Sequence, residues 1–202
     1  SYTTVINCWA KSRQRGAAER AEALLEAMYT ALVNGTASVK PNVRSLNTVL
    51  DAWSKSASPE APQRAEQIMS RMRQHFDSGE LDTKPDYVSY TTVINCWAKS
   101  RQRGAAERAE ALLEEMYTAF VNGNESVKPN VRSLNTVLDA WSKSASPEAP
   151  QRAEQILSRM RQHFDSGELD TKPNYVSYNT VINCWAKSRQ RGAAERAEAL
   201  LE

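Results

Sequence analysis

The stretch SYTTVINCWAKS occupies residues 1–12 and returns unchanged at residues 89–100. A copy with one substitution, SYNTVINCWAKS, begins at Ser177, and the related stretch SLNTVLDAWSKS begins at Ser45 and at Ser133. Successive starting points are therefore always 44 residues apart. A fixed period of this length is typical of a repeat protein in which each repeat is one small supersecondary unit.

Two repeat types, A and B, alternate in the order A-B-A-B-A, and the last A copy is incomplete. Residues 1–44 differ from residues 89–132 at four positions, and residues 45–88 differ from residues 133–176 at two. Such near-identity indicates either a recent duplication or a deliberately designed array, and the residues leave both origins open.

Each repeat predicts two α-helices. In the first helix, four apolar residues stand at positions i, i+3, i+4 and i+7, which places them on one buried stripe. They are Tyr2, Val5, Ile6 and Trp9 in type A and Leu46, Val49, Leu50 and Trp53 in type B. The alternation with a period of two that is typical of β-strands is absent from the sequence.

The second helix of type A is expected to begin near Gly16 and to end at Gly35, because glycine commonly terminates helices. In type B, either Pro59 or Pro62 suits the first turn, where a missing N–H costs nothing, and Gly79 ends the helix. The apolar face of this helix is expected to contain Ala17, Ala21, Leu24, Met28 and Leu32 in type A, and Ala65, Ile68, Met72 and Phe76 in type B.

A Lys-Pro pair closes every complete repeat and stops the chain from continuing as a helix. One helix pair cannot bury its apolar face alone, whereas stacked pairs can. We therefore expect an all-α fold, a right-handed α-solenoid superhelix of helix–turn–helix repeats that forms a single repeat domain over residues 1–202. The expected repeats are 1–42, 43–86, 87–130, 131–174 and, incomplete, 175–202.

Composition narrows the classes of function. The chain is 41% hydrophobic and 25% charged, as soluble folded proteins are, and it has no run of 18 apolar residues, so we expect no membrane association. The net charge is +2 and the pI is about 8.4. Because a pI above about 9 would be needed to indicate nucleic-acid binding by itself, the placement of the charges matters more than their sum.

The sparse cysteines and histidines argue against disulfide, metal and catalytic chemistry. Cys8, Cys96 and Cys184 are equivalent residues in successive A copies, which indicates free thiols in a reducing, intracellular compartment. His75 and His163 have no second ligand at metal-binding spacing, so we expect no metal and no other cofactor. A phosphate-binding glycine loop and a Ser-His-Asp set are also missing, and we expect no enzymatic activity.

Three segments carry a resemblance to a known family. Residues 90–94 begin a first helix with tyrosine, residues 109–116 read AEALLEEM in a second helix, and residues 128–130 close the repeat with Lys-Pro-Asn. This pattern, which recurs along the whole chain, resembles the pentatricopeptide repeat (PPR). The 44-residue repeat is longer than that of the family, with additional residues between the helices and after the second one, and this leaves the spacing of the binding positions open.

The resemblance implies a function. Proteins of this family bind single-stranded RNA along the surface of their first helices, about one base per repeat, and they read each base with one residue early in the first helix and with the last residue of the repeat. Carried onto this chain, the reading pairs are Thr3 with Asn42, Asn47 with Asp86, Thr91 with Asn130, and Asn135 with Asn174, while Asn179 begins a fifth. The implied stacking residues are Arg44, Val88, Arg132 and Val176, the implied target is 5′-A-U-A-Y-3′, and an organelle location follows from the resemblance alone.

The residues themselves are consistent with this interpretation. Thr3, Asn7 and Lys11 stand four residues apart on the first helix and form one polar line, in which amides and hydroxyls suit bases and the lysine suits a phosphate. Two alternatives stay open, because Thr and Asn can bond the local backbone at a helix start and Lys55 can pair with Asp51. The lysines expected at phosphates are Lys11, Lys55, Lys99, Lys143 and Lys187.

Differences between copies fall on the same positions. Asp86 is replaced by Asn174, and Thr91 is replaced by Asn179, so two of the few exchanges affect predicted reading residues. Single-stranded RNA is therefore the expected partner. The alternative is a structural α-solenoid scaffold, natural or designed, that binds protein or associates head-to-tail with other copies, because repeat ends without a polar cap invite stacking.

Overall fold

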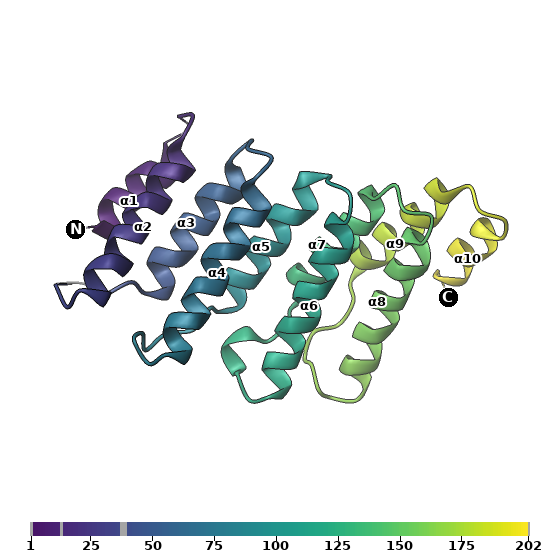
Figure 1. The fold of residues 1–202 in the computed structure, drawn as a ribbon. Helices are drawn as coiled ribbons and strands as arrows, with labels where there is room; N and C mark the ends of the chain where they lie inside the picture. Colours follow the sequence, from purple (N-terminus) through teal and green to yellow (C-terminus); the bar gives the residue numbers. More distant parts are fainter. Residues whose placement is uncertain (1, 13, 37–39, 202) are drawn as a thin grey trace. The chain divides into compact units, whose positions relative to one another are not determined.

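The computed structural model describes residues 2–12, 14–36 and 40–201. Within these residues ten α-helices and one 3-10 helix follow one another, and no strand occurs (Figure 1). The chain divides into two compact units, residues 1–96 and 97–202, which we describe separately. The all-α fold is confirmed, while the single repeat domain and its right-handed superhelix stay predictions.

Every expected repeat contains its two helices. In the first unit, α1 spans Tyr2–Lys11, α2 spans Ala17–Val33, α3 spans Val43–Lys55 and α4 spans Ala61–Asp77. Helix α5, Tyr87–Ser100, begins in the first unit and ends in the second. The second unit continues with α6 at Ala105–Val121, the 3-10 helix at Glu125–Val127, α7 at Val131–Lys143, α8 at Ala149–Asp165, α9 at Tyr175–Ser188 and α10 at Ala193–Ala199.

Within each unit, the first helices of successive repeats pack on one another. Helix α3 packs on α1 in the first unit, and α9 packs on α7 in the second. The second helices connect neighbouring repeats, since α2 contacts both α1 and α3, and α8 contacts both α7 and α9 (Figure 1). This is the arrangement of a helical repeat protein, in which each helix pair covers the apolar face of its neighbour.

The predicted stripe of the first helix is buried in α3, where the most exposed of its four residues, Trp53, is only 2% exposed. The stripe of α1 is covered only in part. Ile6 is fully buried, but Tyr2 and Val5 are 43% and 44% exposed, because in the described residues α1 has a first-helix neighbour on one side only.

The boundaries of the second helix follow from glycine, as predicted. Helix α2 begins directly after Gly16 and ends two residues before Gly35, which has a φ of +68°. The N–H of Gly35 donates to the carbonyl of Leu32, and the N–H of Thr36 donates to that of Ala31. These two bonds form a Schellman motif, which satisfies carbonyls that the last helical turn leaves without a partner.

The buried face of the second helix differs from the prediction. The buried face of α2 includes Leu25 and Tyr29, whereas Leu24 and Leu32 are only half-buried. Leu25 and Tyr29 are buried because α2 lies against α3 as well as α1, so its buried face is wider than one stripe. In α4 the proline of the first turn is Pro62, and Pro59 precedes the helix.

Candidate nucleic-acid interface

The residue that precedes each of the first helices α3, α5, α7 and α9 caps that helix. Asn42, Asn130 and Asn174 precede α3, α7 and α9, and each side-chain oxygen accepts a hydrogen bond from the backbone N–H of the serine three residues later, at 2.9–3.2 Å. Asp86 caps α5 in the same way, at 3.0 Å from the N–H of Ser89. Capping therefore holds all four predicted end-of-repeat reading residues at the amino ends of first helices.

Asn47 lies near the start of α3 and contacts the cap of the next first helix. Its Nδ2 donates to Oδ1 of Asp86 at 3.0 Å, and its Oδ1 accepts a hydrogen bond from the Ser89 hydroxyl at 2.6 Å. The structure thus joins two predicted reading residues that are 39 positions apart in the sequence. Asn47 and Asp86 are both half-buried, so part of each side chain faces solvent.

The second unit contains the same arrangement. Nδ2 of Asn135 donates to Oδ1 of Asn174 at 3.3 Å, and Oδ1 of Asn135 accepts from the Ser177 hydroxyl at 2.6 Å. Among the described residues, the side chains of Asn47 and Asn135 bond the next first helix and not their own backbone, which was the alternative interpretation for these residues. We call the pairs Asn47–Asp86 and Asn135–Asn174 the amide pairs.

The other predicted pairs are not joined in this way. No hydrogen bond links Thr3 to Asn42 in the part of the chain that the structure describes. Thr91 and Asn130 belong to different units, so their pairing stays a prediction. Thr91 is 7% exposed, and its hydroxyl has no hydrogen-bond partner among the described residues. Asn179 is exposed on α9.

The predicted stacking residues stand two positions after the caps, in the first turn of each first helix. Arg44 and Arg132 are exposed, Val176 is 38% exposed, and Val88 is half-buried. All four are thus accessible next to the predicted reading residues, while base stacking itself stays a prediction.

All five lysines expected at phosphates are exposed, but they are not equivalent. Lys55 and Lys143 each form an ion pair, at 2.5 Å, with the aspartate one turn earlier in the same helix. Type A has asparagine at that position, and no acidic partner of Lys11 or Lys187 occurs among the described residues. The alternative role of the type B lysines, pairing within the helix, is therefore confirmed.

Basic residues of successive repeats gather in grooves at the carboxyl ends of the first helices. In the first unit, a groove of about 1010 Å³ is lined by Lys11, Arg15 and Lys55 together with the acid Glu19. In the second unit, a groove of about 580 Å³ is lined by Arg101, Arg103 and Lys143 together with the acid Glu107. Each groove combines more basic than acidic side chains, which suits a negatively charged ligand.

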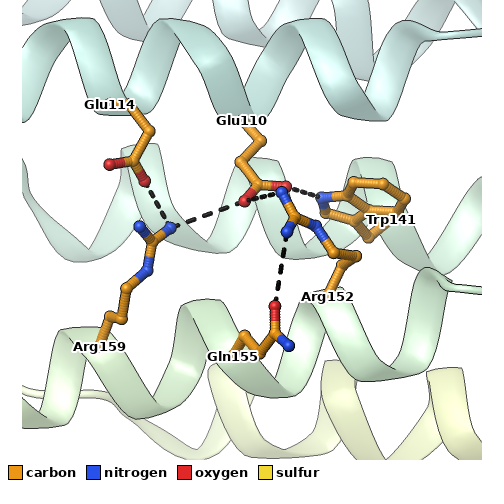
Figure 2. Close-up of polar contacts among 6 residues, drawn as sticks. All are labelled: Glu110, Glu114, Trp141, Arg152, Gln155 and Arg159. Carbon is orange, nitrogen blue, oxygen red and sulfur yellow. Dashed lines mark hydrogen bonds and ion pairs between the residues drawn. The ribbon is translucent and has the colours of Figure 1, made fainter.

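A buried glutamate, which the sequence analysis did not single out, connects neighbouring repeats. Glu110 on α6 is 6% exposed and accepts a hydrogen bond from Nε1 of Trp141 on α7 at 2.9 Å. Its other oxygen lies 2.8 Å from the guanidinium of Arg152 on α8, and Figure 2 shows Arg159 between this carboxylate and that of Glu114. We call the Glu–Trp–Arg set the repeat clamp.

The repeat clamp recurs with the period of the sequence. Glu22, Trp53 and Arg64 form it in the first unit, with distances of 3.0 Å and 2.8 Å. Burial raises the pKa of Glu22, and the neighbouring Arg64 opposes this shift. The available signal in the sequence was the run Arg-Ala-Glu, which types A and B share although most other residues of their second helices differ. It stands at residues 20–22, 64–66, 108–110, 152–154 and 196–198.

The two histidines lie against tyrosines of the preceding repeat. The rings of Tyr29 and His75 stack at 4.5 Å, and the Tyr117 hydroxyl donates to Glu168 at 2.7 Å beside His163. Burial, together with this bond to Glu168, raises the pKa of Tyr117 to about 12. Across residues 2–12, 14–36 and 40–201, no three His, Cys, Asp or Glu side chains gather closely enough to hold a metal ion.

None of the described helices combines the length and the apolar character that crossing a membrane requires.

No model of a known protein family and no curated protein matches the chain. The fold and the site thus define the class of this protein. It is a helical repeat protein in which the amide pairs connect successive first helices by hydrogen bonds. The resemblance to the PPR family rests on the sequence segments quoted above.

Proposed function

We propose that this chain is a PPR-type, sequence-selective single-stranded RNA-binding protein that takes about one base per repeat. The observation that carries this proposal is the pairing of Asn47 with Asp86 and of Asn135 with Asn174. Each amide pair places two polar, partly exposed side chains side by side at the start of a first helix, as reading one base edge requires. In this proposal the repeats continue as a right-handed superhelix whose first helices face the RNA.

The two amide pairs differ in which hydrogen-bonding group of the cap residue is left for a base. Oδ1 of Asp86 is occupied by its bonds to Asn47 and Ser89, and Oδ2 remains an acceptor, which suits the N3–H of uracil. Oδ1 of Asn174 is occupied in the same way, and its Nδ2 remains a donor, which suits N3 of cytosine or a pyrimidine oxygen. These groups support uracil at the second position of the target and a pyrimidine at the fourth.

Adenine at the first and third positions rests on the resemblance alone. The accessible Arg44, Val88, Arg132 and Val176 would stack on the bases, and guanidinium planes are suitable partners for this. Lys11 and Lys187, which lack an acidic partner among the described residues, and the basic grooves would neutralise phosphates. The proposed target is therefore 5′-A-U-A-Y-3′, bound with an affinity of about 1 µM because so few bases are read.

Fluorescence anisotropy with a labelled RNA containing AUAC tests this function. We expect binding that is tighter than to an RNA with AGAG in its place and that weakens with salt, because phosphate contacts release counterions. The variant Asn47→Ala with Asn135→Ala is expected to weaken binding to AUAC about tenfold, since each amide pair loses a donor. The matched control is Asn34→Ala with Asn122→Ala, which removes two exposed amides at the ends of α2 and α6.

Equal binding of AUAC, AGAG and double-stranded RNA by the unaltered chain would contradict the proposed function. A loss of affinity in the control variant as large as that in the Asn47 and Asn135 variant would show that the amide pairs have no special part in binding.

The apolar face of α1 favours a second candidate function, a scaffold that associates with further copies of itself. Val5 is 44% exposed, whereas its equivalent Val181, on a helix that packs on α7, is fully buried. A second copy could cover α1 as α7 covers α9. Light scattering is expected to give a mass that rises with concentration and returns to that of one chain in Tyr2→Lys with Val5→Lys; one mass at all concentrations would exclude this function.

A further inference from the structure

Four equivalent serines occupy the third position of the complete first helices, and their hydroxyls are used in two different ways. Ser45, Ser89, Ser133 and Ser177 are all fully buried. The hydroxyls of Ser45 and Ser133 donate to the backbone carbonyls of their own cap residues at 2.8 Å. The hydroxyls of Ser89 and Ser177 donate instead to the preceding repeat, to the side-chain oxygens of Asn47 and Asn135 at 2.6 Å.

The reading residue of the preceding repeat accounts for this difference. The repeat that precedes Ser45 in the sequence is of type A and has Thr3 at the reading position. The repeat that precedes Ser89 is of type B and has Asn47 there, whose amide reaches the next first helix. A serine hydroxyl has one hydrogen to donate. The Ser89 hydroxyl is 2.6 Å from Asn47 and 3.1 Å from Oδ1 of Asp86, so the amide is the nearer acceptor.

The donors around each amide pair settle which way the amides point. The backbone N–H groups of Val176 and Ser177 can only donate, so the Asn174 atom that they meet is the oxygen. The Asn135 atom that faces this oxygen must then be Nδ2, which leaves Oδ1 of Asn135 for the Ser177 hydroxyl. In the first unit, the carboxylate of Asp86 can only accept, and the same order follows for Asn47 and Ser89.

Two bonds to different atoms hold an amide more tightly than one. With the serine in place, Nδ2 of the asparagine is tied to the cap residue and Oδ1 is tied to the hydroxyl, so the amide plane cannot turn. Without the serine, the amide can rotate about the single remaining bond. That remaining bond is 3.0 Å to the carboxylate of Asp86 but 3.3 Å to the neutral amide of Asn174, so Asn135 depends on its serine more than Asn47 does.

Resting on the RNA-binding function proposed above, we infer that Ser89 and Ser177 are positioning residues that determine base selectivity. Each hydroxyl fixes the amide of the preceding repeat's reading residue, so that its free N–H and the free group of the cap residue face one base edge together. Ser45 and Ser133 cap their helices without this second role. Selectivity at the pyrimidine positions of the target is thus set by a buried residue that does not itself contact the RNA.

The test compares Ser89→Ala with Ser177→Ala against the control Ser45→Ala with Ser133→Ala. Both double variants remove two capping-box hydroxyls, and we expect similar decreases in melting temperature. Anisotropy with AUAC and AGAG RNA gives the selectivity as a ratio of dissociation constants. This ratio is expected to fall about threefold to tenfold in the Ser89 and Ser177 variant and to stay unchanged in the control, as the loss of one orienting hydrogen bond per pair would produce.

The single variants sharpen the test, because Ser177→Ala is expected to reduce selectivity more than Ser89→Ala. In the RNA-free protein, NMR of the side-chain NH2 groups of Asn47 and Asn135 should show faster hydrogen exchange in these variants and not in the control. If the unaltered chain discriminates AUAC from AGAG and both double variants keep its ratio or change it equally, this inference is overturned while the RNA-binding function stands. If the unaltered chain does not discriminate, both fail.

Discussion

Replacing Glu110 by alanine is expected to lower the free energy of unfolding by about 2–4 kcal/mol. Glu110 is buried and is the acceptor for the Trp141 indole N–H at 2.9 Å, and Trp141 is itself only 2% exposed. The variant leaves this N–H without a partner in the core and removes the carboxylate that joins α6 to α7 and α8. The value lies below that of a fully buried ion pair because the side chain of Arg152 is 43% exposed and can turn to solvent.

Urea unfolding followed by circular dichroism measures this change. The matched control is Glu114→Ala, one turn away on the same helix, whose side chain is 45% exposed and, among the described residues, bonds only Arg159 (Figure 2). A surface ion pair of this kind contributes about 0–1 kcal/mol. Glu110→Gln, which keeps an acceptor for Trp141, should fall between the two. Equal stability of the Glu110→Ala and Glu114→Ala variants would show that the repeat clamp does not stabilise the array.

Exchanging the cap residues of the two amide pairs is expected to exchange their base preferences. In Asp86→Asn the free acceptor becomes a free donor, so the second base of the target should change from uracil to cytosine. In Asn174→Asp the fourth base should become uracil. Since each polar contact to a base contributes about 1–3 kcal/mol of discrimination, the ratio of dissociation constants should change about tenfold or more in each variant.

Anisotropy with AUAC, ACAC and AUAU, each flanked by cytidines, checks both exchanges. Folding should be preserved because asparagine and aspartate are equally good cap residues. Asp82→Asn is the control for the change of charge, since Asp82 is exposed in the loop that precedes α5. A shift of preference in the Asp82 variant that matches the Asp86 variant would mean that net charge, and not the reading position, selects the base.

The helices of this protein could be predicted from the sequence because local residues specify them. The i, i+3, i+4, i+7 stripe of α3 is buried as predicted, and Gly16 and Gly35 bound α2 where a left-handed backbone is needed. The prediction was less accurate where burial depends on a neighbour. Leu24 is half-buried and Tyr2 is exposed, whereas their equivalents Leu112 and Tyr90 are buried, because burial at one repeat position depends on which helices lie against it.

One part of the candidate site could likewise be predicted from local sequence, and another part depends on tertiary packing. That Asn42, Asn130 and Asn174 stand at helix starts is a property of the sequence, since asparagine followed three residues later by serine forms a capping box. That Asn47 meets Asp86 follows only from the structure, because the two residues are 39 positions apart and a whole second helix and two loops lie between them.

By itself, therefore, the sequence determined the repeat, its two helices, their caps and their ends, all of which depend on contacts within a few residues. The tertiary structure decided which buried polar groups meet. Trp53 reaches Glu22 across 31 residues and Ser89 reaches Asn47 across 42, and both contacts arise from the packing of one repeat on the next. A local pattern states that a residue is polar or apolar, whereas the partner of a buried polar group depends on the distance between helices that only packing sets.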